Sequence, residues 1–206
     1  MSKLNCLEIQ TKSCDYTNKL LDKLLFLNQD ALVKVNIKEI EKAIWCAKKY
    51  HANQKRHSGE PYYSHPIEVA GVTAEYIFDT ETIIAALLHD VVEDTDSHLS
   101  QIELIFGTKV AEIVNALTKI SFNLLLSKEE TFNKINLFQD SQKKAITIKV
   151  IDRLHNIRTI NYIKSVEKQK RIAKETMQFY IPLAKYANLH LIAQELQDSV
   201  IKILNL

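Results

Sequence analysis

Glycine and proline are scarce in this chain, which has three of each in 206 residues. Both residues interrupt regular backbone, and a many-stranded sheet uses them repeatedly in its turns. Gly59, Pro61 and Pro66 fall within eight positions, so long stretches on either side lack both residues. The sequence therefore predicts an all-α fold with long helices.

Apolar residues recur at helical spacing along most of the chain. The predicted helices cover 18–29, 37–53, 66–77, 80–95, 100–106, 108–120, 141–164, 168–186 and 189–204. Ser100 with Glu103, and Ser127 with Glu130, fit the capping box that satisfies backbone donors in a first turn. Gly107 can adopt the left-handed conformation that ends a helix.

Composition and charge bound the class of protein. A hydrophobic fraction of 46% is enough for one packed domain, predicted over 20–206 after an N-terminal tail of 1–19. The 27 basic and 25 acidic residues lack the basic excess typical of nucleic-acid binding. The first residues lack a signal-peptide core, and no stretch reaches the roughly 20 apolar residues of a membrane span. Three cysteines without ligand spacing indicate reduced thiols. We expect a soluble, cytoplasmic protein.

Four ionisable residues follow the apolar run 83–88: His89, Asp90, Glu93 and Asp94. A helix that is apolar all round lies inside a protein, and an isolated buried charge costs several kcal/mol, so these groups need partners or a metal. Adjacent His89 and Asp90 diverge by about 100° on a helix, yet both can reach one cation. A buried histidine held by Glu93 is the alternative interpretation.

The segment 56–66 combines a turn with a helix start. Gly59 and Pro61 indicate the turn, and His65-Pro66 indicates the first helical residues. His65 would be a rigidly placed ligand, although taken alone it is more often a helix-start residue with no partner beyond water. Arg56 could clamp an anion or stack on a base, although an arginine taken by itself is far more often an ordinary surface residue.

A third segment, 148–159, carries Asp152, Asn156 and Thr159 on one polar stripe of a helix. Asp152 could be a metal ligand, with the other two facing a substrate. In isolation, a solvated face with Asp152 paired to Lys149 or Arg153 is the more common arrangement.

Together, the three segments supply two imidazoles and two carboxylates: His65, His89, Asp90 and Asp152. Nitrogen and oxygen donors without thiolate suit Mn²⁺, Fe or Zn²⁺. Such a metal would orient a phosphoryl group and lower the pKa of bound water. Glu93 and Asp94 would then position the water or transfer its proton.

These residues resemble the HD-type hydrolase domain of the RelA/SpoT family of alarmone enzymes. The resemblance covers roughly residues 20–206 and is far more specific than a bare His-Asp pair. Its motifs occur in the family's order and spacing: 56–62 with 65–66, 85–95, 117–119, 152–159 and 175–184.

The resemblance implies an all-α HD-domain helical bundle and a guanosine-3′,5′-bis(diphosphate) 3′-pyrophosphohydrolase. Such an enzyme removes the 3′-pyrophosphate of ppGpp or pppGpp, giving GDP or GTP, and lowers the stringent-response alarmone. One Mn²⁺ per active site would be held by His65, His89, Asp90 and Asp152. Glu93 and Asp94 would serve the attacking water. The nucleotide would be bound by Arg56, His57, Ser58, Asn156 and Thr159.

The chain departs from the family at several places. His57 stands where the family usually has Lys or Arg, which is expected to weaken phosphate contacts or make them pH-sensitive. Segment 121–140 lacks the usual pattern and is either a mobile flap or an exposed connection. Residues 185–188 replace the usual His-Arg-Leu-Gly. The synthetase and C-terminal domains of long members are absent, so alarmone synthesis is not expected.

Two alternatives stay open. One is an HD phosphohydrolase that acts on another nucleotide, and the other is a catalytically weak alarmone-binding module. The expected partner is a small guanosine nucleotide, with no nucleic acid and no membrane. A homo-oligomer is compatible with the sequence.

Overall fold

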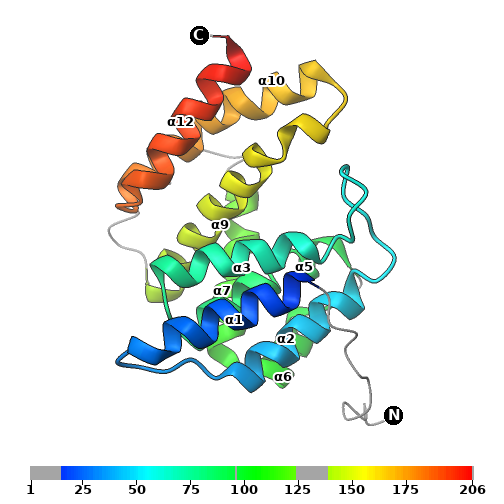
Figure 1. Ribbon diagram of the computed structural model, residues 1–206, viewed down its shortest axis with the longest axis vertical. Coiled ribbons are helices and arrows are strands. Elements are labelled where there is room, and N and C mark those ends of the chain that lie inside the picture. Colours follow the sequence, from blue (N-terminus) through cyan, green and yellow to red (C-terminus); the bar gives the residue numbers. More distant parts are fainter. Residues whose placement is uncertain (1–14, 96, 124–138, 206) are drawn as a thin grey trace.

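The computed structural model describes residues 15–95, 97–123 and 139–205 (Figure 1). Within these ranges an isolated bridge between Lys55 and Pro61 is the only strand-like pairing, which confirms the predicted all-α class. The α-helices are α1 (Asp15–Asp30), α2 (Ile37–Tyr50), α3 (Ser64–Tyr76), α4 (Thr80–Leu87), α5 (Val91–Asp94), α6 (Leu99–Phe106), α7 (Thr108–Asn123), α9 (Asp140–Arg158), α10 (Val166–Glu175), α11 (Ile181–Tyr186) and α12 (His190–Leu204). A 3₁₀ turn η2 (Ile160–Tyr162) and a π-helix η3 (Thr176–Tyr180) complete them.

Helix α9 connects two groups of helices. It packs against α3 and α7 on one side and against α12 and η3 on the other. In Figure 1, α1, α2 and α3 lie at the lower end of the molecule, and α10 and α12 lie at the upper end. Val150, Ile151 and Leu154 of α9 are buried in the common core. Each such side chain contributes about 1.5–3 kcal/mol on burial, so α9 is held firmly between the groups.

Several helices start and end as local chemistry dictates. The Asp79 carboxylate accepts from the Thr82 backbone N–H at 2.8 Å and caps α4. Gly107 ends α6 with a positive φ, as predicted, and its N–H donates to the Glu103 carbonyl. Its ψ of 168° is extended, so the predicted left-handed helical conformation is not adopted. The predicted capping box at Ser100 and Glu103 is wrong, because α6 already begins at Leu99. The predicted box at Ser127 and Glu130 lies outside the described residues.

The predicted continuous helix over 80–95 is wrong. Helix α4 ends at Leu87, and α5 begins at Val91. The His89 Nδ1 atom lies 2.8 Å from the Ala86 carbonyl oxygen, which a continuous helix would pair with the Asp90 N–H. The turn between the helices lets His89 and Asp90 converge instead of diverging.

Other boundaries differ in smaller ways. The predicted helix over 141–164 is α9 followed by η2, and the predicted helix over 168–186 is α10, η3 and α11. Residues 15–19 of the predicted tail belong to α1, and 1–14 lie outside the described ranges. Most of 121–140 is also outside them. No helix in the described part of the chain is long and apolar enough to cross a membrane.

Candidate metal centre and active site

Three elements bring the four predicted metal ligands together. His65 is the second residue of α3, His89 and Asp90 lie in the turn between α4 and α5, and Asp152 is on α9. His65 and His89 are 2% and 1% exposed, and Asp152 is 9% exposed. We call these four residues the donor cluster.

The donor atoms lie close enough to share one ion. His65, His89 and Asp152 each offer a ligand atom within 4.8 Å of the others. Asp90 joins them, with Oδ1 3.1 Å from His89 Nε2 and Oδ2 3.7 Å from His65 Nε2. His65 Nε2 lies 3.1 Å from Asp152 Oδ1.

The state of His89 fits a metal ligand. Its Nδ1–H donates to the Ala86 carbonyl, so the ring presents a lone pair on Nε2 once it has lost its second proton. Among the described residues this buried Nε2 has no hydrogen-bond partner, and an orphaned buried nitrogen costs roughly 1–3 kcal/mol. A cation between His89, His65 and the two carboxylates would satisfy it, so the residues present fit a metal ion.

Burial and charge set the pKa values of the cluster. Burial disfavours the His89 imidazolium, but the carboxylates of Asp90 and Asp152 outweigh it and raise the His89 pKa to about 9. Burial opposes ionisation of Asp90, yet the charge of His89 lowers the Asp90 pKa to about 2. The Asp152 pKa is also well below its ordinary value, against burial, because His65 donates to it. A cation would compete with the proton on His89, so metal binding releases protons.

Each carboxylate of the cluster has a further hydrogen-bond donor. The Tyr62 hydroxyl donates to Asp90 Oδ2 at 2.9 Å. The Asn156 amide donates to Asp152 Oδ1 at 2.7 Å. Sequence reasoning assigned Asn156 to the substrate and gave Tyr62 no role, because nothing local indicated that either would reach a carboxylate.

The histidines are also held at their second nitrogen. His65 Nδ1 lies 2.9 Å from His155 Nδ1, and the two ring centroids are 4.7 Å apart. Burial, followed by the charge of His65, lowers the His155 pKa to about 3, so its ring is neutral. His155 was not predicted as a site residue, although it lies three positions after Asp152 on the same helix and its spacing could have indicated it.

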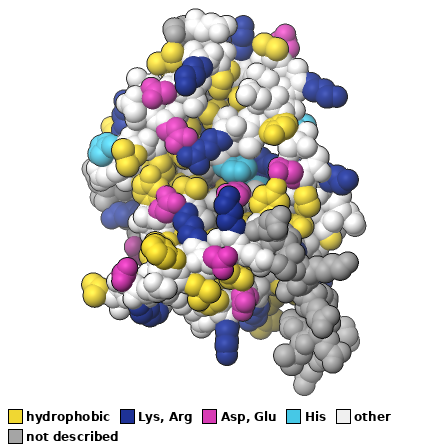
Figure 2. Space-filling view, in the orientation of Figure 1, with side chains coloured by type: hydrophobic (Ala, Val, Ile, Leu, Met, Phe, Trp, Pro, Cys, Tyr) yellow, Lys and Arg dark blue, Asp and Glu magenta, His cyan; other side chains and the backbone are white. Residues whose placement is uncertain are grey.

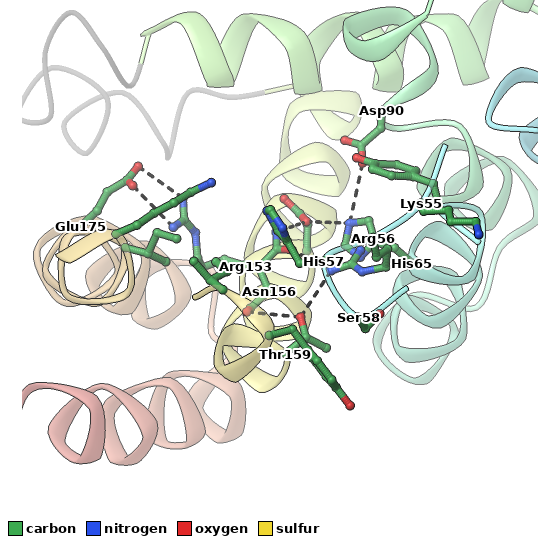
Figure 3. A pocket seen from close by; sticks show the side chains of 16 residues that line it. Lys55, Arg56, His57, Ser58, His65, Asp90, Arg153, Asn156, Thr159 and Glu175 are labelled. Carbon is green, nitrogen blue, oxygen red and sulfur yellow. Dashed lines mark hydrogen bonds and ion pairs between the residues drawn. The ribbon is translucent and has the colours of Figure 1, made fainter. Parts of the chain in front are cut away.

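A cavity of about 510 Å³ opens beside the donor cluster (Figure 3). All five predicted nucleotide-binding residues line it, with three members of the cluster. Sequence reasoning gave no site role to the other lining residues, which include Lys168 and Ile172 of α10. We call the exposed residues of the whole lining the open wall: Lys55, His57, Tyr162, Lys168 and Glu175. Figure 2 shows histidine surface near the centre of this face, with acidic and basic side chains around it.

Arg56 ties the turn after α2 to α9. Its Nη2 donates to Asn156 Oδ1 at 3.4 Å and to Thr159 Oγ1 at 3.3 Å (Figure 3). Within the turn, the Arg56 N–H donates to the Glu60 carbonyl and Gly59 has φ +89°, a conformation that favours glycine. The edge of the guanidinium is therefore fixed by α9 while its plane stays in the cavity wall.

The two predicted catalytic acids are on α5. Glu93 is exposed and does not line the cavity, although its charge contributes to raising the Lys149 pKa against the effect of burial. Asp94 ends α5, and its side chain lies outside the described part of the structure. Their catalytic role stays a prediction.

The fold and the buried His-Asp cluster define the class of protein. Residues 43–188 match the model of the HD domain, and the chain belongs to this family.

Among its relatives, the chain is 44% identical over 167 residues to a guanosine-3′,5′-bis(diphosphate) 3′-pyrophosphohydrolase of Aquifex aeolicus, covering 81% of this chain and 24% of that protein. It is 39% identical over 183 residues to the bifunctional (p)ppGpp synthase/hydrolase SpoT of Escherichia coli, covering 87% and 26%. The chain thus spans about a quarter of the length of these curated relatives.

A solved structure is also similar to the chain. It is described as a metazoan ortholog of SpoT that hydrolyses ppGpp and plays a role in starvation responses. The TM-score is 0.56 at 25% identity, over 81% of this chain and 94% of that one. The match supports the arrangement of helices around the site.

Proposed function

We propose that the protein hydrolyses the 3′-pyrophosphate of ppGpp or pppGpp, with water, to GDP or GTP and pyrophosphate. The observation that carries the proposal is the convergence of the donor cluster with Arg56, Asn156 and Thr159 on one cavity. Relatives named as ppGpp hydrolases at about 40% identity support it. The substrate is a small guanosine nucleotide, so the activity needs neither nucleic acid nor a membrane, and we infer a cytoplasmic location.

We assign one Mn²⁺ to the donor cluster, held by His65, His89, Asp90 and Asp152. When bound, such an ion polarises a phosphoryl oxygen and lowers the pKa of water. Mixed imidazole and carboxylate donors are compatible with Mn²⁺, and the preference for it over Zn²⁺ or Fe rests on the family resemblance.

The part of the cavity that would bind the nucleotide is built from charged and planar side chains. Arg56 would stack its guanidinium on the guanine, because Asn156 and Thr159 already hold its edge. Ser58 and His57, on the same turn, would contact the ribose or phosphate groups. The basic side chains Lys55, Arg153 and Lys168 in the wall favour an anionic ligand.

Glu93 and Asp94 would act on the attacking water. A carboxylate of this pair accepts the proton that the water loses, and the pyrophosphate leaves from the 3′-oxygen, which takes up a proton in turn. Glu93 lies near enough for its charge to act on Lys149, whose pKa the charges of Asp152 and Asp90 also raise against the effect of burial. This proximity supports a position beside the donor cluster.

One assay tests the proposal. Purified protein is incubated with ppGpp and Mn²⁺, and GDP and pyrophosphate are quantified by ion-exchange chromatography. Production of both in equal amounts is the expected result. Turnover of other nucleotides without ppGpp turnover would favour a phosphohydrolase of different specificity. Tight ppGpp binding without turnover would favour the binding module. The His190→Asn variant, changed at an exposed position of α12, is the control for the variants described below and should turn over ppGpp like the wild type.

A further inference from the structure

The two histidines of the donor cluster are held by different kinds of partner. His89 Nδ1 is bound to the backbone carbonyl of Ala86, at 2.8 Å. His65 Nδ1 is bound to a side chain, His155 Nδ1, at 2.9 Å. A backbone carbonyl only accepts, whereas an imidazole nitrogen can donate or accept. The tautomer of His65 therefore depends on His155.

We propose that His155 is a positioning residue of the metal centre, which sets the tautomer and the orientation of the His65 ring. A neutral imidazole carries one N–H, so donation from His65 Nδ1 to His155 leaves the lone pair of His65 on Nε2. In the metal-free structure this Nε2 donates to Asp152 Oδ1 at 3.1 Å and lies 3.7 Å from Asp90. A cation bound between these groups would take the place of that proton, so the neutral His65 ring would then carry its N–H on Nδ1, facing His155. The inference rests on the metal site assigned under the proposed function.

The reverse hydrogen bond would disable the ligand. If His155 donated, the His65 proton would lie on Nε2 and point to Asp152 Oδ1, leaving no lone pair for a cation. In the metal-bound state His155 must therefore accept at Nδ1 and carry its own proton on Nε2. Partners that hold the second nitrogen of a ligating histidine typically contribute 10–100-fold to metal affinity.

The position of His155 separates this role from substrate binding. It lies on α9 between Asp152 and Asn156, yet it is not among the residues that line the cavity. Its ring packs against His65, with a centroid separation of 4.7 Å. A change at His155 therefore acts on the metal site through His65 and leaves the cavity wall in place.

The test compares two variants of the full chain. In His155→Asn the amide oxygen can replace Nδ1 as an acceptor, whereas His155→Leu has no acceptor. Mn²⁺ binding to metal-free protein is measured without nucleotide, by calorimetry or electron paramagnetic resonance. We expect an affinity loss of about 10–100-fold for the leucine variant and no more than a few-fold loss for the asparagine variant. His190→Asn is the control.

A second readout does not depend on the leucine variant folding. Nitrogen-15 NMR of histidine-labelled wild-type protein is expected to show His65 protonated at Nδ1 in the Mg²⁺- or Zn²⁺-loaded state. Equal affinity losses in both variants, an unchanged affinity in His155→Leu, protonation of His65 at Nε2, or no metal binding by the wild type would each overturn the inference. Metal binding without ppGpp hydrolysis would instead contradict the proposed function alone.

Discussion

The donor cluster and the open wall face the same cavity but differ in how their side chains are held. In the cluster, His65 is 2% exposed and each of the four residues has a hydrogen-bond partner beyond the others. On the open wall, Lys55, His57 and Lys168 are exposed. A set of side chains held by hydrogen bonds away from water is preorganised and intolerant of change, whereas exposed charges are screened by water and salt. Substitutions should therefore have large effects on the cluster and small ones on the wall.

The largest effect is expected from Asp152→Asn. The amide keeps the volume of the side chain but removes the negative charge that would hold a cation. We expect kcat to fall by roughly a thousandfold or more, equivalent to about 4 kcal/mol, with little change in Tm. Steady-state ppGpp hydrolysis and thermal melting measure both. If hydrolysis persisted at a tenth of the wild-type rate, Asp152 would not be a metal ligand.

Arg56→Ala should have an intermediate effect, because Arg56 lies between the two regions and is fixed by Asn156 and Thr159. Loss of a stacking guanidinium is expected to raise KM about 10–30-fold, roughly 1.4–2 kcal/mol, with a smaller change in kcat. Arg171→Ala, at an exposed position of α10 outside the cavity, is the control. A fall in kcat at unchanged KM would argue against nucleotide binding by Arg56.

Asp79→Asn tests the scaffold that carries His89. Asp79 caps α4 at the end opposite His89. Burial raises the Asp79 pKa, but hydrogen bonds from Thr82 and the charge of Lys144 outweigh it, so the Asp79 pKa is lowered. A lowered folded-state pKa means that the stabilisation is present above the unfolded value of about 3.9 and is lost as pH falls through the folded value. We expect the variant to lose about 1 kcal/mol at pH 7, or roughly 2–4 °C in Tm.

The same variant should approach the wild type in stability below about pH 4, where Asp79 becomes protonated on unfolding. Its KM for ppGpp should not change. Glu81→Gln, which weakens an exposed pair with Lys109, is the control and should change Tm little. A difference in unfolding free energy between wild type and variant that stayed constant from pH 7 to pH 3 would contradict the cause given for the Asp79 pKa.

The smallest effect is expected from His57→Lys on the open wall. A permanent positive charge there should lower KM a few-fold at low ionic strength, by well under 1 kcal/mol, and the gain should shrink in salt. KM measured at two salt concentrations checks this. If KM fell by as large a factor in His57→Lys as it rises in Arg56→Ala, the open wall would interact with the substrate as strongly as the Arg56 guanidinium does.

Much of the fold was predictable because its causes are local. Apolar residues at helical spacing indicated most of the helices, and Gly107 indicated the end of α6. The break at Leu88 was not predictable from spacing. There the His89 ring takes the Ala86 carbonyl from the helix, in an environment that buries both residues. The predicted capping by Ser100 is wrong because α6 starts one residue before it, at Leu99.

The sequence by itself determined the all-α class, because periodicity is local in the chain, and it determined the donor types of the cluster, because donor chemistry depends on residue type. Only the tertiary structure decided what surrounds them. His65 and His155 are 90 positions apart, and Arg56 and Thr159 are 103 apart. Such contacts depend on how α3 and the turn after α2 pack on α9. The same packing places α10 across the cavity and gives one side of the substrate site its exposed charges.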